Sequence, residues 1–143
     1  MCANEQLLIA IHKNAEMGKN TLDKLLPESK GEIRAVLEEQ LEEYKRIFMA
    51  ADTLLKSMDG NDGGVPPMTK VMSDLMIEVQ TLSDKTPAHL SEMVLKGIDL
   101  GIEEINSALN ELQLKAKPET VNLANTLRTF LMRNKETLQR FSA

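Results

Sequence analysis

Four side chains of this chain could bind a metal ion if the fold brought them together: His12, Glu16, Glu39 and Glu43. His12 and Glu16 are four residues apart, so they lie on one face of a helix. An antiparallel neighbouring helix could add Glu39 or Glu43, and imidazole and carboxylate groups are common ligands of zinc and iron. We prefer the alternative interpretation, in which all four are solvated residues on helix surfaces.

Two amide side chains interrupt otherwise apolar helical stripes. Gln40 falls in the stripe that includes Leu37 and Tyr44, and Asn134 lies between Leu131 and Leu138. Both are positions that a helix bundle buries. We expect the two amides to hydrogen-bond across the bundle and to set the helix register at some cost in stability. Gln40 could instead meet a water molecule or Glu43.

Three glycines lie inside predicted helices: Gly18, Gly97 and Gly101. A glycine within a helix costs about 1 kcal/mol relative to alanine, so it usually has a packing reason. We expect close helix contacts at these positions, preferably within one chain, with a second subunit as the alternative.

Capping and breaking residues divide the chain into five predicted helices, over about residues 4–26, 29–58, 67–83, 87–114 and 118–142. Asn4 can cap the first helix, and Ser29 with Glu32 forms a capping box for the second. Glycines and a proline pair in residues 59–67 predict the main linker. We predict an all-α fold and one domain over residues 1–143, with no strand.

The lengths of these segments suggest a topology. The second helix should span about 42 Å at roughly 1.5 Å per residue, and the linker with the short third helix can travel back along most of that length. The fourth helix can therefore run parallel to the second, which is the single-crossover arrangement of a four-helix bundle. The third helix either packs on the bundle or spans a dimer.

Composition excludes several classes of protein. Of the 143 residues 42% are hydrophobic and only 3% aromatic, and the net charge of −5 argues against nucleic-acid binding. The longest apolar runs are far shorter than the roughly 20 residues of a membrane span. The single cysteine, Cys2, allows no intrachain disulfide, so we predict a cytoplasmic protein.

The segments NAEMGKNTLDKLLPES and IRAVLEEQLEEYKRIFMAADTLL resemble the first two helices of small bacterial ferritin-like proteins, including uncharacterised bundle families and spore coat F-like domains. This resemblance implies a ferritin-like four-helix bundle that often forms dimers. It does not imply one activity, because that superfamily includes both metalloenzymes and metal-free members.

A di-iron site in such a bundle requires Glu-x-x-His on two of the helices. Ile9 precedes His12 by three residues and Thr86 precedes His89, so neither histidine belongs to this motif. At the corresponding place in the second helix stand Gln40 and Glu43, and an amide is a poor ligand for a hard metal ion.

No nucleophile, phosphate-binding loop or catalytic triad is apparent in the sequence. We therefore predict a non-enzymatic structural or protein-interaction role, without a cofactor, through a homodimer or a protein partner. The alternative is a ferritin-like metal-binding protein with a degenerate site.

Overall fold

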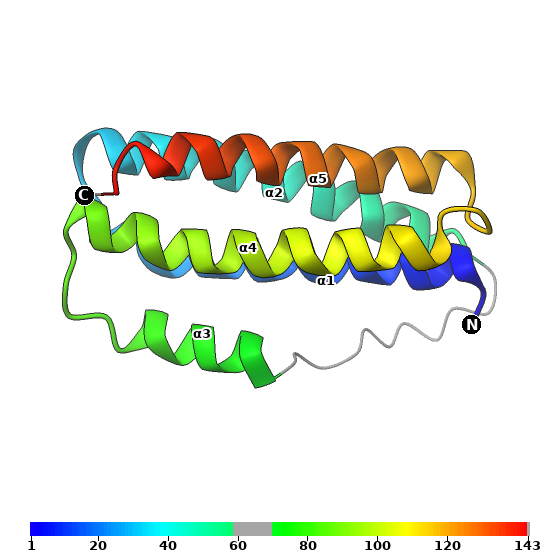
Figure 1. The fold of residues 1–143 in the computed structure, drawn as a ribbon, viewed down its shortest axis with the longest axis horizontal. Helices are drawn as coiled ribbons and strands as arrows, with labels where there is room; N and C mark the ends of the chain where they lie inside the picture. The colour runs from blue at the N-terminus through cyan, green and yellow to red at the C-terminus, as the bar shows by residue number, and fades with distance from the viewer. Residues whose placement is uncertain (59–69, 143) are drawn as a thin grey trace.

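The computed structural model describes residues 1–58 and 70–142, with the backbone alone for residues 70–74. Most of the described residues lie in helices. The elements, labelled in Figure 1, are α1 (Ala3–Leu25), a short 3₁₀ turn η1 (Leu26–Glu28), α2 (Gly31–Lys56), α3 (Lys70–Gln80), α4 (Pro87–Leu112) and α5 (Pro118–Gln139). The described residues include no strand, and the prediction of an all-α protein is confirmed.

The four long helices pack side by side. α1 contacts α2 and α4, α5 contacts α4 and, less extensively, α2, and α3 lies outside against α1 and α4. In Figure 1, α2 and α4 run from left to right, whereas α1 and α5 run from right to left. Because the short α3 contacts α1 and α4, it lies on the face of the bundle opposite the pair formed by α2 and α5.

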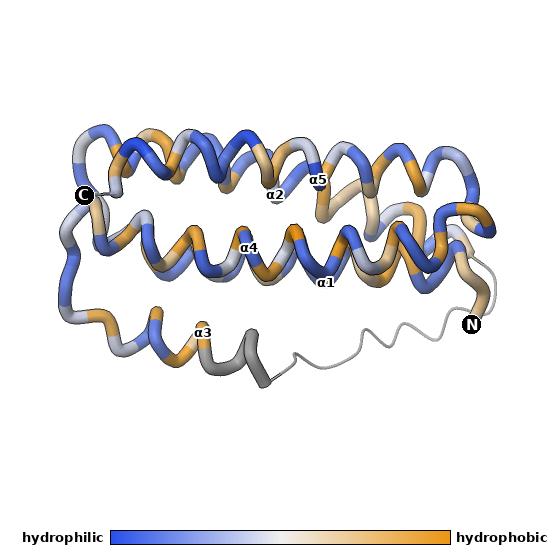
Figure 2. Tube along the Cα trace, in the orientation of Figure 1, coloured by the Kyte–Doolittle hydropathy of each residue, from blue (hydrophilic) through white to orange (hydrophobic). Residues whose placement is uncertain are grey.

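Apolar residues at helical spacing form the core. Figure 2 shows hydrophobic positions recurring along each long helix, as expected of amphipathic helices that pack against one another. The interior contains Ile11, Leu37, Ile105 and Leu127, each almost completely buried. Across α2 and α5, the rings of Tyr44 and Phe130 meet edge to face with their centroids 4.8 Å apart.

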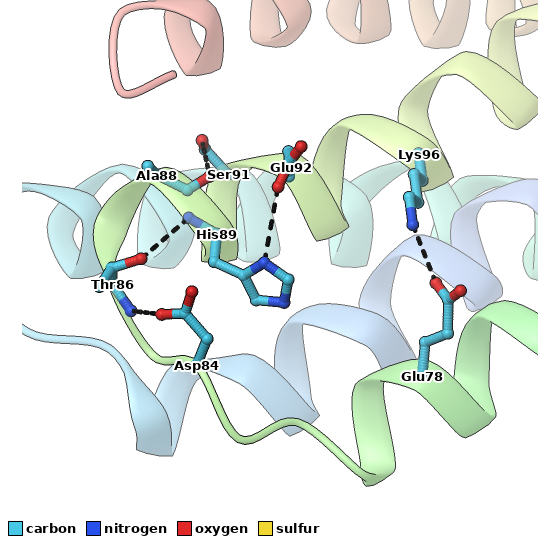
Figure 3. Close-up of polar contacts among 8 residues, drawn as sticks. All are labelled: Glu78, Asp84, Thr86, Ala88, His89, Ser91, Glu92 and Lys96. Atoms are coloured by element: carbon cyan, nitrogen blue, oxygen red, sulfur yellow. Dashed lines mark hydrogen bonds and ion pairs between the residues drawn. The ribbon is translucent and has the colours of Figure 1, made fainter. Parts of the chain in front are cut away.

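Prolines define two helix starts, because proline suits the first turn, where its missing N–H is not needed. α4 begins at Pro87 and α5 at Pro118, at the predicted residues. The Thr86 hydroxyl caps α4 by accepting a hydrogen bond from the backbone N–H of His89, as Figure 3 shows.

The predicted caps of the first two helices are wrong. The hydroxyl of Ser29 donates to the carbonyl of Leu26 at 2.8 Å, and α2 begins after Lys30 without a side-chain cap. Asn4 lies inside α1, where its side-chain oxygen accepts from the backbone N–H of Lys117. Tertiary contacts and the preceding 3₁₀ turn use these side chains in place of helix capping.

The third helix packs on the bundle of its own chain. Leu75 and Val79 are buried in the common core, and the ammonium of Lys96 on α4 binds the carboxylate of Glu78 on α3 at 3.2 Å (Figure 3). The predicted linker at 59–67 and the predicted start of this helix lie outside the described residues. Within the described ranges, no helix has the length and hydrophobicity needed to cross a membrane.

Candidate functional site

A groove of about 270 Å³ lies between α2 and α5. It combines polar, charged and apolar side chains from both helices: Val36, Glu39, Gln40, Glu43 and Arg46 from α2, and Phe130, Arg133, Asn134 and Thr137 from α5. The two amides singled out in the sequence therefore line one and the same groove.

Gln40 is the least satisfied polar residue of this groove. Its side chain is buried with 3% of its surface exposed, and neither Oε1 nor Nε2 has a hydrogen-bond partner among the described residues. Nδ2 of Asn134 is likewise buried and unpaired. The structure does not contain the hydrogen bond that we predicted between the two amides. Three buried polar atoms beside this groove therefore lack a hydrogen-bond partner among the described residues, and such unpaired buried groups are costly.

Charged side chains of both signs surround these amides. The guanidinium of Arg46 binds the carboxylate of Glu43 one turn away, with Nε 3.1 Å from Oε2, and this hydrogen bond raises the pKa of Arg46. No ion pair within residues 1–58 and 70–142 involves Glu39 or Arg133. The four charges sum to zero, so the groove has no excess of either sign.

An aromatic pair lies beside this groove. Tyr44 is one turn from Gln40, and its ring meets that of Phe130 on α5 edge to face and also packs over Gly18 of α1. Aromatic rings prefer such edge-to-face contacts. Burial raises the pKa of Tyr44, so its hydroxyl remains neutral.

A second polar cluster lies at the junction of α1 and α2. Nε2 of His12 is 3.2 Å from Oδ1 of Asp52, whose Oδ2 binds the ammonium of Lys56 at 2.8 Å. The imidazole also packs against the ring of Phe48, with the centroids 4.4 Å apart. Hydrogen bonding to Lys56 and, to a lesser degree, to His12 lowers the pKa of Asp52. His12 is almost completely buried and its Nδ1 has no partner among the described residues.

The four candidate metal ligands are not gathered into one site. His12 pairs with Asp52, whereas Glu39 and Glu43 line the groove between α2 and α5. Glu16 is only partly buried. In the part of the chain that the structure describes, no three His, Cys, Asp or Glu side chains form a group that could hold a metal ion.

The three glycines differ in how tightly they are packed. A Cβ atom at Gly18 would lie 2.3 Å from the ring of Tyr44, and one at Gly101 would lie 2.9 Å from Oδ1 of Asn14. At Gly97 the nearest neighbour would be Leu75 at an ordinary 3.5 Å. Close helix contact within the chain therefore explains Gly18 and Gly101, but not Gly97.

Several residues at these two places were not identified from the sequence. Asp52, the partner of His12, is an ordinary charged position in an amphipathic helix, and only the register of α1 on α2 reveals it. Thr137 is one turn from Asn134, so the amide itself was the signal for that residue. Arg133 directly precedes Asn134 in the sequence, and helical spacing does not predict its place in the groove.

Comparison of the chain with known protein families, with curated proteins and with solved structures gives no match.

Proposed function

We propose that this chain is a non-enzymatic interaction protein that forms a homodimer through the face made by α2 and α5. The observation that carries the proposal is the groove on that face with the buried, unpaired amide of Gln40. An unpaired buried polar group costs about 1 to 3 kcal/mol, and a second chain covering the groove could supply the missing partner. α3 covers the opposite face, and no described element covers the face made by α2 and α5.

The charges around the groove suit contact with an identical surface. A two-fold dimer places one patch against a copy of itself, so the patch must be complementary to itself. Glu39 and Arg133 provide one charge of each sign, and neither has an ion-pair partner within the described ranges. We expect Glu39 of each chain to meet Arg133 of the other.

The arrangement of helices supports a ferritin-like bundle with one crossover as the finer description of the fold. α2 and α4 run in the same direction, and α3 lies on the path of the chain between them. Together with the resemblance of α1 and α2 to small bacterial ferritin-like proteins, this favours a metal-free member of that class. The exposed Cys2, which forms no disulfide within the described residues, suits a reducing cytoplasm.

The test is the oligomeric state in solution. Sedimentation velocity across micromolar concentrations should show a dimer, and Arg133→Glu should weaken it because like charges then meet. Adding Glu39→Arg to that variant should restore the dimer. Lys115→Glu, an exposed substitution in the connection between α4 and α5, is the matched control and should have no effect.

Two outcomes would contradict this proposal. A strictly monomeric protein would remove self-association, and a dimer indifferent to Arg133→Glu would place the interface elsewhere. Elemental analysis addresses the alternative function, because a stoichiometric content of iron, manganese or zinc would favour the metal-binding protein.

A further inference from the structure

We propose that the groove between α2 and α5 is a binding site for a primary carboxamide, the group at the end of asparagine and glutamine side chains. The inference goes beyond self-association, because one chain supplies all the groups that recognise the ligand. It depends on the buried amide of Gln40, whose two polar atoms are both unpaired, and on Nδ2 of Asn134.

The unpaired atoms specify what the ligand must offer. Oε1 of Gln40 requires a hydrogen-bond donor, and Nε2 of Gln40 and Nδ2 of Asn134 require acceptors. A carboxamide oxygen has two lone pairs and can accept from both nitrogens, while its NH₂ group donates to Oε1 of Gln40. If the amide group of Gln40 is turned by 180°, its oxygen and nitrogen exchange places. The side chain still offers one donor and one acceptor, so the ligand must still provide one of each.

Other polar groups fit this pattern less well. A carboxylate has no donor, so it would bring its negative charge against Oε1 of Gln40. An ammonium ion has no acceptor for the two amide nitrogens. The charges around the groove sum to zero, and Glu43 is already bound by Arg46, which favours a neutral ligand.

Geometry further separates primary from secondary amides. The N–H and C=O of a trans peptide group point in opposite directions, so a backbone amide cannot bond to both atoms of one Gln40 side chain. In a primary carboxamide one N–H lies on the same side as the oxygen, and two parallel hydrogen bonds can form. The groove volume of about 270 Å³ is just below the range for drug-sized ligands and suits a side chain or a small molecule.

The experiment follows the side-chain NH₂ signals of Gln40 and Asn134 by NMR, assigned through their loss in Gln40→Leu and Asn134→Leu. Titration with propionamide should shift both signals in a saturable manner. Propionate, of similar size, should bind at least about tenfold more weakly, since one good hydrogen bond corresponds to about that factor. N-methylacetamide, a model of the peptide backbone, should bind as weakly as propionate.

Variants test whether these residues recognise the amide. Gln40→Leu should abolish saturable binding, and Asn134→Leu, which removes one donor, should weaken it about tenfold. Lys115→Glu, an exposed substitution in the connection between α4 and α5 and outside the groove, should leave binding intact. If Gln40→Leu failed to fold, Asn134→Leu and the comparison of propionamide with propionate would still test whether the groove recognises the carboxamide.

Two further measurements identify the source of the carboxamide. The same shifts on raising the protein concentration without propionamide would mean that a second copy supplies an asparagine or glutamine side chain. Shifts with propionamide alone, in a protein that stays monomeric, would support a small-molecule or other protein ligand and would contradict only self-association.

Three outcomes would overturn the carboxamide site. One is equal binding of propionate and propionamide. Another is contact of the Gln40 NH₂ group with an ordered water that propionamide does not displace. The third is a direct hydrogen bond between Gln40 and Asn134, seen as a shift of the Gln40 signal in Asn134→Leu together with indifference to propionamide.

Discussion

Asn14, between α1 and α4, and Gln40, between α2 and α5, are buried to the same degree, with 2% and 3% of their surfaces exposed. Asn14 donates a hydrogen bond from Nδ2 to the carbonyl of Gly101 at 2.9 Å. Gln40 has no hydrogen bond within the described residues. The same chemical group therefore has a hydrogen bond on one side of the bundle and, within the described residues, none on the other.

The side chains that separate the helices account for the difference. Gly101 has no Cβ, so α1 and α4 come close enough for a side-chain amide to reach a backbone carbonyl. Beside Gln40 the rings of Tyr44 and Phe130 occupy the space between α2 and α5. A glycine thus lets two helices approach closely enough to satisfy a buried amide, whereas the aromatic contact beside Gln40 provides no hydrogen-bond partner for it among the described residues.

The largest effect is expected when a substitution fills the space above a glycine where α1 packs on α2. Gly18→Ala should reduce the free energy of unfolding by about 2 to 3 kcal/mol, because the new Cβ would lie 2.3 Å from the buried Tyr44 ring. Gly97→Ala is the matched control and should raise that free energy by about 0.5 to 1 kcal/mol, since it improves helix propensity without a clash. Urea denaturation measures both, and equal stability of the two variants would contradict this packing.

A smaller loss is expected when the satisfied amide is removed. Asn14→Leu should lower the free energy of unfolding by about 1 to 2 kcal/mol, through the lost bond to Gly101 and the crowding of the bulkier side chain. Thermal and urea unfolding would show the loss. An unchanged free energy of unfolding would mean that the hydrogen bond between Asn14 and Gly101 stabilises the fold no more than water stabilises the same amide in the unfolded chain.

The unpaired amide should respond in the opposite direction. Gln40→Leu should leave the free energy of unfolding unchanged or raise it by up to about 1 kcal/mol, because it removes a buried polar group that no described residue satisfies. The same urea titration, performed beside Asn14→Leu, measures the contrast directly. Destabilisation by several kcal/mol would show that Gln40 takes part in a polar network essential to the fold.

The smallest effect concerns the partly exposed Asp52, which pairs with the buried His12, and it depends on pH. A carboxyl group whose pKa is lower in the folded chain stabilises the fold above its unfolded pKa and loses this contribution as the pH falls through the folded value. Lys56 and then His12 lower the pKa of Asp52. Asp52→Asn should therefore cost about 0.5 kcal/mol or less at neutral pH, and this cost should vanish as the pH falls well below about 4.

Unfolding at a series of pH values checks this prediction, with the double variant Asp52→Asn/Lys56→Met as its control. The second substitution should add little once the carboxylate is gone. A cost that persisted at low pH would show that Asp52 acts through packing and not through charge.

Helix starts were predictable where a local signal decides them. Pro87 and Pro118 begin their helices because proline is accepted only in the first turn. The predicted helix ends extend two to three residues too far for the helices that end at Lys56, Leu112 and Gln139. No comparable signal marks the last turn of these helices.

The partner of His12 could not be predicted, because it depends on how α1 and α2 are aligned. The contact of Gly18 with Tyr44 sets that register, and Asp52 then lies opposite His12. Glu39 and Glu43 lie nearer to the connection between the helices. In contrast, helical spacing alone places Gln40 on an inner stripe, and Gln40 is buried, whereas Asn134, which we also expected in the core, is only partly buried.

The attachment of α3 has a consequence for hydrogen exchange. This 11-residue helix is held by the buried Leu75 and Val79, by a contact between Thr21 and Met76, and by the pair of Glu78 and Lys96. A helix of that length is marginal on its own, so its amides should exchange whenever it detaches locally. The amides in the middle of α1 and α4 should exchange only when the whole bundle unfolds. In deuterated water the backbone should therefore show two classes of protection, with α3 in the faster one.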